Sequence, residues 1–347
     1  MKKIIVFLFA FLILNVNAYA SYVVLNQEDN KVIEGYHIHD KRLIASITKV
    51  MTAHIVISNM NLNKLVTVGD EINDAHGSSV YLEKGETISI RDLLYGMMLR
   101  SGNDAAIVLA KNVGGSVENF VKLMNDEVKQ LGLKDTFFSN PTGLDDSDDG
   151  NISSAYDMAI ITNRAMKNDV FRTIFKTKRY RCKTNKKSYD WYNKNKTLTM
   201  YKYTNGGKTG YTKKAKRTLI TTASKDNTNL TIVTLNMTDD FNFHINKYKN
   251  IYSEYSRYLI VNKYDLNIND KEYKKKNCTF KVNNNYYILE KKNNLKNIHV
   301  DYIINSNVKP KSNSIVGRLI VYNKKKAIYE EPIYLICNFQ GKSIWLH

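Results

Sequence analysis

Apolar residues recur at helical spacing through much of the first half of the chain. The clearest segment is 116–132, in which Ser116 can cap the N-terminus and Gly132 can end the helix. Its apolar residues share one face: Phe120, Leu123, Met124, Val128 and Leu131. The same spacing predicts helices over 47–60, on both sides of a tight turn within 89–115, and over 153–168.

Strand-like patterns lie on both sides of this helical region. Residues 22–38 predict a hairpin, and residues 205–237 predict a run of strands joined by tight turns. An apolar stripe then predicts a helix from about His244 that carries Tyr248, Ile251, Tyr252, Tyr255 and Leu259 on one face. From Lys263 onward the pattern becomes strand-like again, which predicts a small all-β second domain.

The N-terminus has the pattern of a secretory signal. Lys2 and Lys3 precede an apolar stretch from Ile4 to Leu14, and Ala18-Tyr19-Ala20 supplies a small-x-small cleavage site. The apolar run is too short for a comfortable membrane span, so a cleaved signal is favoured over an uncleaved anchor. We therefore expect the mature protein to act outside the cytoplasm.

These patterns predict three regions. Residues 1–20 are the expected signal peptide, residues 21–262 a large α+β domain, and residues 263–347 a small β-rich domain. The chain ends in "NFQGKSIWLH", which is too short to lie stably on a bilayer as a helix, so the sequence predicts no clear C-terminal anchor.

The chain is strongly basic, with a formal net charge of +19. Nucleic acid is not expected as a partner, because the protein is expected to be exported and contains no basic recognition helix or aromatic RNA-binding motif. Outside a cell, anionic membrane lipids or wall polymers are the candidate partners, and a solvated basic surface is the simpler reading.

Three cysteines, Cys182, Cys278 and Cys337, are far apart and match no metal or redox spacing. Their number allows one disulfide and excludes a dense disulfide framework. We expect buried free thiols.

Three short motifs follow one another along the chain: Ser46-Ile47-Thr48-Lys49, Ser101-Gly102-Asn103 and Lys208-Thr209-Gly210. The first alone is weak, because about two S-x-x-K matches are expected by chance in this composition. A second match, Ser306 to Lys309, lies in the β-rich region without partner motifs. The three motifs together are more significant than the first alone, because they are predicted to lie at a helix start, at a turn between helices and at the edge of a hairpin sheet.

Together the three motifs resemble the S-x-x-K, S-x-N and K-T-G signatures of the penicillin-recognising serine enzymes. The segments "HGSSVYLEKGETISIRDLLYGMMLRSGNDAAIVLA" and "NPTGLDDSDDGNISSAYDMAII" are similar to D-alanyl-D-alanine carboxypeptidases, the low-molecular-mass penicillin-binding proteins, and the resemblance covers about residues 22–260. It implies an antiparallel sheet flanked by helices, with a helical subdomain, as in β-lactamases and DD-peptidases. The trailing β domain also suits that family.

The spacing of the first motif makes chemical sense. Residues three apart share a helix face, so Lys49 Nζ can reach Ser46 Oγ. Lysine acts as a base only when burial or a neighbouring cation lowers its pKa, and Lys208 is a candidate for that cation.

By resemblance, Ser46 is the nucleophile that forms an acyl-enzyme and Lys49 takes its proton. Ser101 relays a proton to the leaving amine, and Asn103 orients Lys49 and the substrate amide.

The resemblance also implies a substrate-binding strand. Lys208, Thr209, Gly210 and the strand edge after them hold the terminal carboxylate and the backbone of the substrate, and the N–H groups of Ser46 and Tyr211 form the oxyanion hole. The implied substrates are peptidoglycan stem peptides ending in D-Ala-D-Ala, β-lactams are covalent inhibitors, and no metal or cofactor is required.

The sequence departs from this family pattern at several positions. Ile44 stands where proline is usual, and Lys216 stands where glycine usually follows Ala215. Members often carry an arginine after the strand that corresponds to "LTIVTL", whereas "NMTDDFNFHINKYK" contains none. The arginine that family members often carry near the carboxylate site is therefore missing from this segment.

Two other functions remain as alternatives. A serine β-lactamase of the same fold usually has S-D-N and a deacylating glutamate, whereas this chain has Gly102 and only aspartates among the acidic residues of 145–149. A non-catalytic envelope protein that binds wall peptides or polyanions is the second alternative.

Other candidate sites are weaker. No G-x-S-x-G nucleophile elbow is present. His37 and His39 are expected to share a strand face, where exposed histidines are favoured over a metal site. The segment 145–151 resembles a calcium loop but lacks the bidentate glutamate, which favours a solvated acidic loop.

Overall fold

The computed structural model describes residues 19–145, 150–309 and 311–337. The described residues divide into two compact units. The first runs to Ser224 and resumes over Asn229–Ile245, and the second comprises Lys225–Thr228 and the chain from Asn246 onward.

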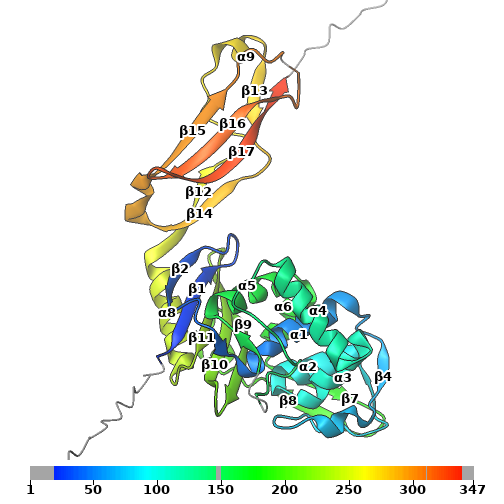
Figure 1. Ribbon diagram of the computed structural model, residues 1–347. Coiled ribbons are helices and arrows are strands. Elements are labelled where there is room, and N and C mark those ends of the chain that lie inside the picture. Colours follow the sequence, from blue (N-terminus) through cyan, green and yellow to red (C-terminus); the bar gives the residue numbers. More distant parts are fainter. Residues whose placement is uncertain (1–18, 146–149, 310, 338–347) are drawn as a thin grey trace, which may run out of the picture. The chain divides into compact units, whose positions relative to one another are not determined.

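A five-stranded sheet in the order β2-β1-β11-β10-β9 forms the frame of the first unit (Figure 1). The predicted N-terminal hairpin is confirmed, because β1 and β2 pair antiparallel. β9 and β10 also pair antiparallel, and β9 is the edge strand. The strands are β1 (Ser21–Asn26), β2 (Val32–Tyr36), β9 (Thr204–Thr212), β10 (Lys216–Lys225) and β11 (Thr228–Leu235).

Helices cover both faces of this sheet (Figure 1). On one face, α8 (Asp240–Glu254) contacts the sheet through His244, whose ring nitrogens hydrogen-bond the hydroxyls of Thr221 and Thr234 at 2.7 and 3.0 Å. The opposite face bears α1 (Lys49–Asn59), α5 (Ala155–Ala165) and α6 (Asp169–Lys176). This arrangement confirms the expected antiparallel sheet flanked by helices.

A helical subdomain and three short two-stranded pairs complete the first unit. The helices of the subdomain are α2 (Ile90–Tyr95), α3 (Asn103–Gly114) and α4 (Val117–Gln130), and the short helix α7 (Thr197–Met200) packs against β9. The pairs are β3 (Arg42–Leu43) with β6 (Ile152–Ser153), β4 (Leu65–Thr67) with β5 (Thr87–Ser89), and β7 (Arg179–Lys183) with β8 (Ser188–Tyr192). Two 3-10 helices (Ala45–Thr48 and Asp70–Asp74) and a π-helical turn (Gly96–Arg100) link them.

Local sequence signals explain where several helices begin. The hydroxyl of Ser116 accepts a hydrogen bond from Asn119 N at the start of α4, and Ser154 accepts one from Asp157 N at the start of α5. α1 differs from these amphipathic helices because the core surrounds it, and residues 49–56 are all buried. A buried helix in the middle of the unit gives the residues at its N-terminal end a fixed, water-poor environment.

The second unit is built from strands, which confirms the predicted small all-β region. β12 (Tyr255–Val261) pairs with β14 (Tyr286–Lys291), and a second sheet has the order β13-β17-β16-β15. The strands of that sheet are β13 (Cys278–Lys281), β15 (Ile298–Ile304), β16 (Ile315–Asn323) and β17 (Lys326–Cys337). The short helix α9 (Lys271–Lys275) and a 3-10 helix (Lys292–Asn297) complete the unit.

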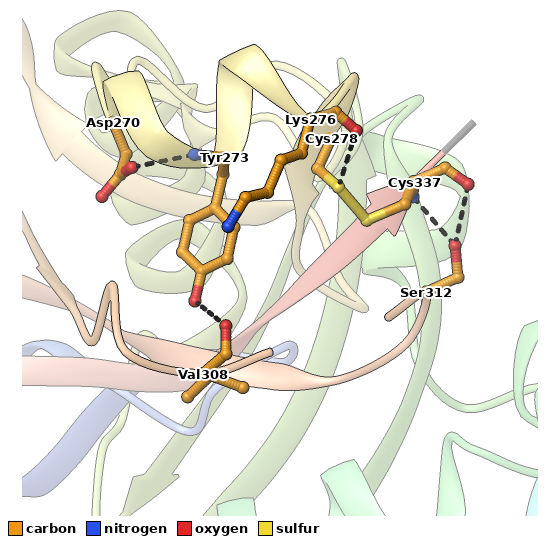
Figure 2. Close-up of a disulfide and its surroundings, with 7 residues drawn as sticks. All are labelled: Asp270, Tyr273, Lys276, Cys278, Val308, Ser312 and Cys337. Carbon is orange, nitrogen blue, oxygen red and sulfur yellow. Dashed lines mark hydrogen bonds between the residues drawn. A yellow bond between two sulfur atoms is a disulfide. The ribbon is translucent and has the colours of Figure 1, made fainter. Parts of the chain in front are cut away.

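A disulfide between Cys278 and Cys337 joins the neighbouring strands β13 and β17 of this unit (Figure 2). The expectation of free thiols is therefore wrong for these two residues. They lie directly opposite each other in the β13–β17 pair, a register that spacing along the chain does not reveal. Cys182 is the free cysteine.

The helix predicted from His244 is confirmed only in part. α8 starts earlier, at Asp240, and ends at Glu254, so Tyr255 and Leu259 lie in β12 instead of on a helical stripe. Tyr255 and Leu259 pair there with Lys291 and Tyr287 of β14. Strand pairing from far along the chain thus overrides the local periodicity.

The second unit also takes in β12, which precedes the division expected between residues 262 and 263. The expected signal segment lies mostly outside the described residues. Within the described ranges, no helix is both long and apolar enough to cross a bilayer.

Candidate active site

Ser46 and Lys49 lie at the N-terminal end of the buried helix α1. Ser46 is the second residue of the 3-10 helix Ala45–Thr48, and Lys49 is the first residue of α1. A 3-10 helix has 3.0 residues per turn, so side chains three apart are eclipsed. Lys49 Nζ accordingly lies 3.1 Å from Ser46 Oγ.

Lys49 is fully buried and has two further hydrogen-bond partners. Its Nζ donates to Asn103 Oδ1 at 2.7 Å and to the carbonyl oxygen of Thr142 at 2.5 Å. Neither of these oxygens can donate a proton, so two N–H bonds of Nζ are committed. The third contact is to a hydroxyl, which can donate. In the neutral amine, the remaining lone pair of Nζ is therefore the acceptor for the Ser46 O–H.

Burial, together with the charge of Lys194 and against an opposing contribution from Asp104, lowers the pKa of Lys49 to about 7. The sequence suggested Lys208 as the neighbouring cation, whereas burial is the larger cause and Lys194 is the cation that acts on Lys49. Near neutral pH a substantial fraction of Lys49 is thus unprotonated, the state that a general base requires.

Ser101 and Asn103 approach Lys49 from the turn between the π-helical segment and α3. Ser101 ends that segment with φ of +68°, a left-handed conformation that is uncommon for a residue with a Cβ. Asn103 begins α3, and its Nδ2 donates to the carbonyl of His76. This second bond fixes the amide so that Oδ1 faces Lys49. Both side chains are buried.

Lys208 reaches the same place from β9. Its buried Nζ donates to Ser101 Oγ at 3.0 Å and to the carbonyl of Thr209 at 2.7 Å. Burial, followed by the charges of Lys49 and Lys194, lowers the pKa of Lys208. Each charged amine therefore disfavours protonation of the other.

The edge of β9 lies against the Ser46 turn. Gly210 is essential to this approach, because a Cβ there would lie 2.3 Å from Thr218 Oγ1 and 2.9 Å from Ser46 N. Tyr211 follows and is 64% exposed. The backbone nitrogen of Ser46 thus lies against the edge strand at the residue before Tyr211.

An open cleft gives access to this group. Its volume is about 410 Å³, and its lining residues are Ser46, Ser78, Ser101, Lys194, Lys196, Thr209, Gly210, Tyr211, Arg217 and Phe241. Lys49 and Lys208 lie behind this lining and hydrogen-bond Ser46 and Ser101 respectively, and Asn103 hydrogen-bonds Lys49. The structure therefore brings all eight residues singled out from the sequence to one cleft.

Sequence reasoning missed two contributors, the Thr142 carbonyl and Lys194. Thr142 acts through its backbone, which carries no residue-type signal. Lys194 lies in a lysine-rich stretch, 183–196, where nothing local distinguishes it. Only the fold shows that it lies 3.2 Å, Nζ to Oγ, from Ser78 and lines the cleft.

The weaker candidates lie elsewhere. Ser306 belongs to the second unit, where its hydroxyl donates to Asp270 at 2.8 Å. His37 and His39 do not share a strand face, since β2 ends at Tyr36, and they contact Asp40 and Asp135 respectively. Among the described residues, no cluster of His, Cys, Asp or Glu could hold a metal ion. The acidic segment 146–149 lies outside the described residues.

Comparison with known proteins identifies relatives of this chain. The sequence profile of the D-alanyl-D-alanine carboxypeptidases, peptidase family S11, matches residues 14–239. The D-alanyl-D-alanine carboxypeptidase DacF of Bacillus subtilis is 35% identical over 213 residues, which cover 60% of this chain and 54% of DacF. The chain spans about half the length of this curated relative.

Solved structures show the same fold. Penicillin binding protein 6B from Escherichia coli superposes with a TM-score of 0.73 at 24% identity, over 90% of this chain and 93% of that one. A D-alanyl-D-alanine carboxypeptidase from Mycobacterium tuberculosis gives a TM-score of 0.64 at 26% identity, over 67% of this chain and 90% of the other.

Proposed function

The chain belongs to the D-alanyl-D-alanine carboxypeptidase family, and from that premise we propose that it is a serine-type D-Ala-D-Ala carboxypeptidase that removes the terminal D-alanine from peptidoglycan stem peptides. The observation that carries the proposal is the contact of Lys49 Nζ with Ser46 Oγ at 3.1 Å, inside a cleft completed by Ser101, Asn103 and Lys208.

Acylation begins with proton transfer from Ser46 to the neutral amine of Lys49. The Ser46 oxygen attacks the carbonyl between the two D-alanines and forms a tetrahedral intermediate. The N–H groups of Ser46 and Tyr211 stabilise its oxyanion. This assignment is supported by the Ser46 N–H lying against the edge strand at Gly210.

Release of D-alanine requires a proton on the leaving amine. Ser101 Oγ is hydrogen-bonded to Lys208 Nζ, so it can pass a proton to the amine and regain one from the lysine side. Asn103 holds Lys49 in place and offers its amide to the substrate backbone. Water then hydrolyses the acyl-enzyme and regenerates Ser46.

The edge of β9 binds the peptide. The residues after Lys208 present an unpaired strand edge to the cleft, with which an extended substrate backbone can pair. Thr209 and Lys208 supply a hydroxyl and an amine toward the end of the substrate. Because the mechanism uses the chain's own proton donors and acceptors throughout, we propose no metal or cofactor for it.

The decisive test is release of D-alanine from a pentapeptide stem. We expect the unsubstituted protein to release it and Ser46→Ala to lose the activity entirely while unfolding at the same temperature. A folded protein that releases D-alanine from no stem peptide contradicts the proposal.

A labelled penicillin separates the alternatives. A long-lived adduct of one penicillin on Ser46, seen by mass spectrometry, supports the carboxypeptidase. Fast turnover of the penicillin points to a β-lactamase, and the absence of any covalent mass points to a binder of wall peptides.

We further propose that the protein works outside the cytoplasm in the cell envelope. The N-terminal signal pattern and the +19 charge support this, since wall polymers and membrane lipids there are anionic. Cell fractionation tests the location, and release of the protein from envelopes by salt tests the charge-based attachment.

A further inference from the structure

One end of the cleft is formed by residues that the mechanism above leaves unused. Arg217 lies on β10 directly opposite Tyr211 of β9, and both line the cleft together with Phe241. Side chains of directly opposed residues share one face of an antiparallel pair. The Arg217 side chain therefore borders the same cleft as the strand edge proposed to hold the substrate.

The guanidinium is held rigidly from one side. Its Nη2 and Nε donate to the two carboxylate oxygens of Asp240 at 2.6 and 3.2 Å, and its Cζ lies 5.1 Å from the centre of the Phe241 ring. Asp240 is the first residue of α8 and is only 1% exposed. A bidentate pair and a ring contact fix both the plane and the direction of the fork.

The opposite edge of the fork remains available. A guanidinium has five N–H donors, and the pair with Asp240 uses two. Within the described part of the chain Nη1 has no acceptor, and the Arg217 side chain is 40% exposed. The Nη1–Nη2 edge can thus donate two parallel hydrogen bonds to a second planar acceptor, and a carboxylate has the matching geometry.

We propose that Arg217 binds the terminal carboxylate of the D-Ala-D-Ala peptide, with Asp240 and Phe241 as its positioning residues. This inference rests on the proposed function. Residues 236–239, which follow β11, contain no arginine, and Arg217 is the arginine among the cleft-lining residues. Arg217 thus supplies, from β10, the positive charge that is missing from the segment after β11.

The cleft lysines do not replace this interaction. Burial lowers the pKa of Lys208, so its charge is weakened. Lys194 and Lys196 are point charges on flexible stems and cannot offer a planar fork. A bidentate arginine therefore distinguishes a free carboxylate from the amide or cross-linked carbonyl of a longer peptide.

A purely structural role is the competing explanation, because the Arg217–Asp240 pair also fastens the start of α8 to β10. That role predicts a change in stability without a change in ligand preference. Binding is therefore measured in the inactive Ser46→Ala protein, using diacetyl-L-lysyl-D-alanyl-D-alanine and the same peptide with its C-terminus amidated.

We expect the Ser46→Ala variant to bind the peptide with a free carboxylate (the acid) about 10- to 100-fold more tightly than the amidated peptide (the amide). This factor corresponds to the usual free energy of hydrogen bonds between charged groups. Adding Arg217→Gln and Asp240→Asn together should bring the two affinities within about twofold of each other. The paired change avoids leaving a buried carboxylate without its partner. Arg217→Lys keeps the charge without the fork and should lose most of the preference.

Arg179 provides the matched control. It too is paired with a carboxylate, Asp190, and lies 4.7 Å from the ring centre of Tyr192, but it does not line the cleft. Arg179→Gln with Asp190→Asn should leave the acid preference unchanged.

The proposal is overturned if Ser46→Ala does not prefer the acid, or if its preference survives the loss of Arg217. Failure of this inference can be distinguished from failure of the proposed function. If the protein releases D-alanine but its preference for the free carboxylate does not depend on Arg217, the proposed activity stands and the proposed role of Arg217 is refuted. If the preference depends on Arg217 but the protein releases no D-alanine, the proposed role of Arg217 stands and the proposed carboxypeptidase activity is refuted.

Discussion

At the scale of single residues, the hydrogen bonds of Lys49 decide how its amine meets Ser46. Two carbonyl oxygens, from Asn103 and Thr142, take two N–H bonds and orient the third position of Nζ toward Ser46 Oγ. A protonated amine in that position would donate to Ser46 and hold its hydroxyl proton in place. A neutral amine accepts that proton, so the protonation state of one side chain switches the site between resting and reactive.

This dependence predicts a pH profile. Below pH 7 the ammonium has no lone pair, so kcat/KM for D-alanine release should fall about tenfold per pH unit, and above pH 7 it should reach a plateau. The second-order rate of penicillin acylation should follow the same curve. A flat profile between about pH 5.5 and 9 would exclude Lys49 as the titrating base.

Lys194 should set the position of that profile. Its charge lowers the pKa of Lys49, so Lys194→Gln removes a repulsion and should move the inflection to higher pH. Lys178→Gln, a lysine that does not line the cleft, is the control and should leave the inflection in place. A shift to lower pH, or none, would contradict the electrostatic coupling.

Residue types and spacing were sufficient to select the members of the candidate site but not their electrostatics. Ser46 and Lys49 could be chosen because their spacing matches helical geometry, and Asn103 because Ser101-Gly102-Asn103 resembles the S-x-N signature of the family. The roles of Lys194 and of the Thr142 carbonyl depend on loops folding back over α1, and no local pattern encodes that contact.

At the scale of elements, the site depends on a close approach between the Ser46 turn and β9. The 3-10 turn aligns Ser46 with Lys49, and the absence of a side chain at Gly210 lets the strand edge reach Ser46 N. Gly143 plays a related part behind the turn, because it has φ of +84° and a Cβ there would lie 2.0 Å from the carbonyl oxygen of Ala45.

Gly210→Ala should therefore separate folding from catalysis. The added methyl group must displace either Thr218 or the Ser46 turn, and a displacement of about 1 Å can lower the acylation rate about 100-fold. The measurement is the rate of penicillin acylation under native conditions. Unaltered acylation would show that the strand edge does not need its present distance from Ser46.

Gly132→Ala is the control for this substitution. Gly132 has φ of +67° after α4 and no atom within 4 Å of an added Cβ. The change should lower the free energy of unfolding by about 1 kcal/mol through backbone strain and leave acylation intact.

Elements were predictable from sequence wherever local signals decide them. Ser116 caps α4 as expected, Ser154 caps the helix expected within 153–168, and the N-terminal hairpin forms between its two strands. The end of α8 was not predictable, because β12 depends on its pairing with β14, about thirty residues further along the chain.

At the scale of the whole molecule, the disulfide and the candidate active site lie in different units. The Cys278–Cys337 disulfide closes a sequence separation of 59 residues within the second unit, whereas the candidate site lies entirely in the first. Ser312 hydrogen-bonds Cys337 on both its N–H and its carbonyl, and the Tyr273 hydroxyl donates to the Val308 carbonyl nearby (Figure 2).

Cys278→Ser with Cys337→Ser should accordingly destabilise the second unit without affecting acylation. Chain-entropy arguments for a loop of this length give a loss of about 4 kcal/mol in its free energy of unfolding. Denaturant unfolding followed by circular dichroism measures the loss, and labelled penicillin measures the site. Cys182 should not interfere, since burial raises the pKa of its thiol to about 12. Loss of acylation in the double variant would show that the first unit requires the second.

Three segments, at residues 46–49, 101–103 and 208–210, make up the reactive group, and the last arrives some 160 residues after the first. A nascent chain that has not yet delivered β9 has a serine and a lysine but no complete cleft around them. Fluorescent penicillin should therefore label finished molecules and ignore unfinished ones. The rate at which labelling appears after synthesis then measures how quickly new molecules complete the cleft.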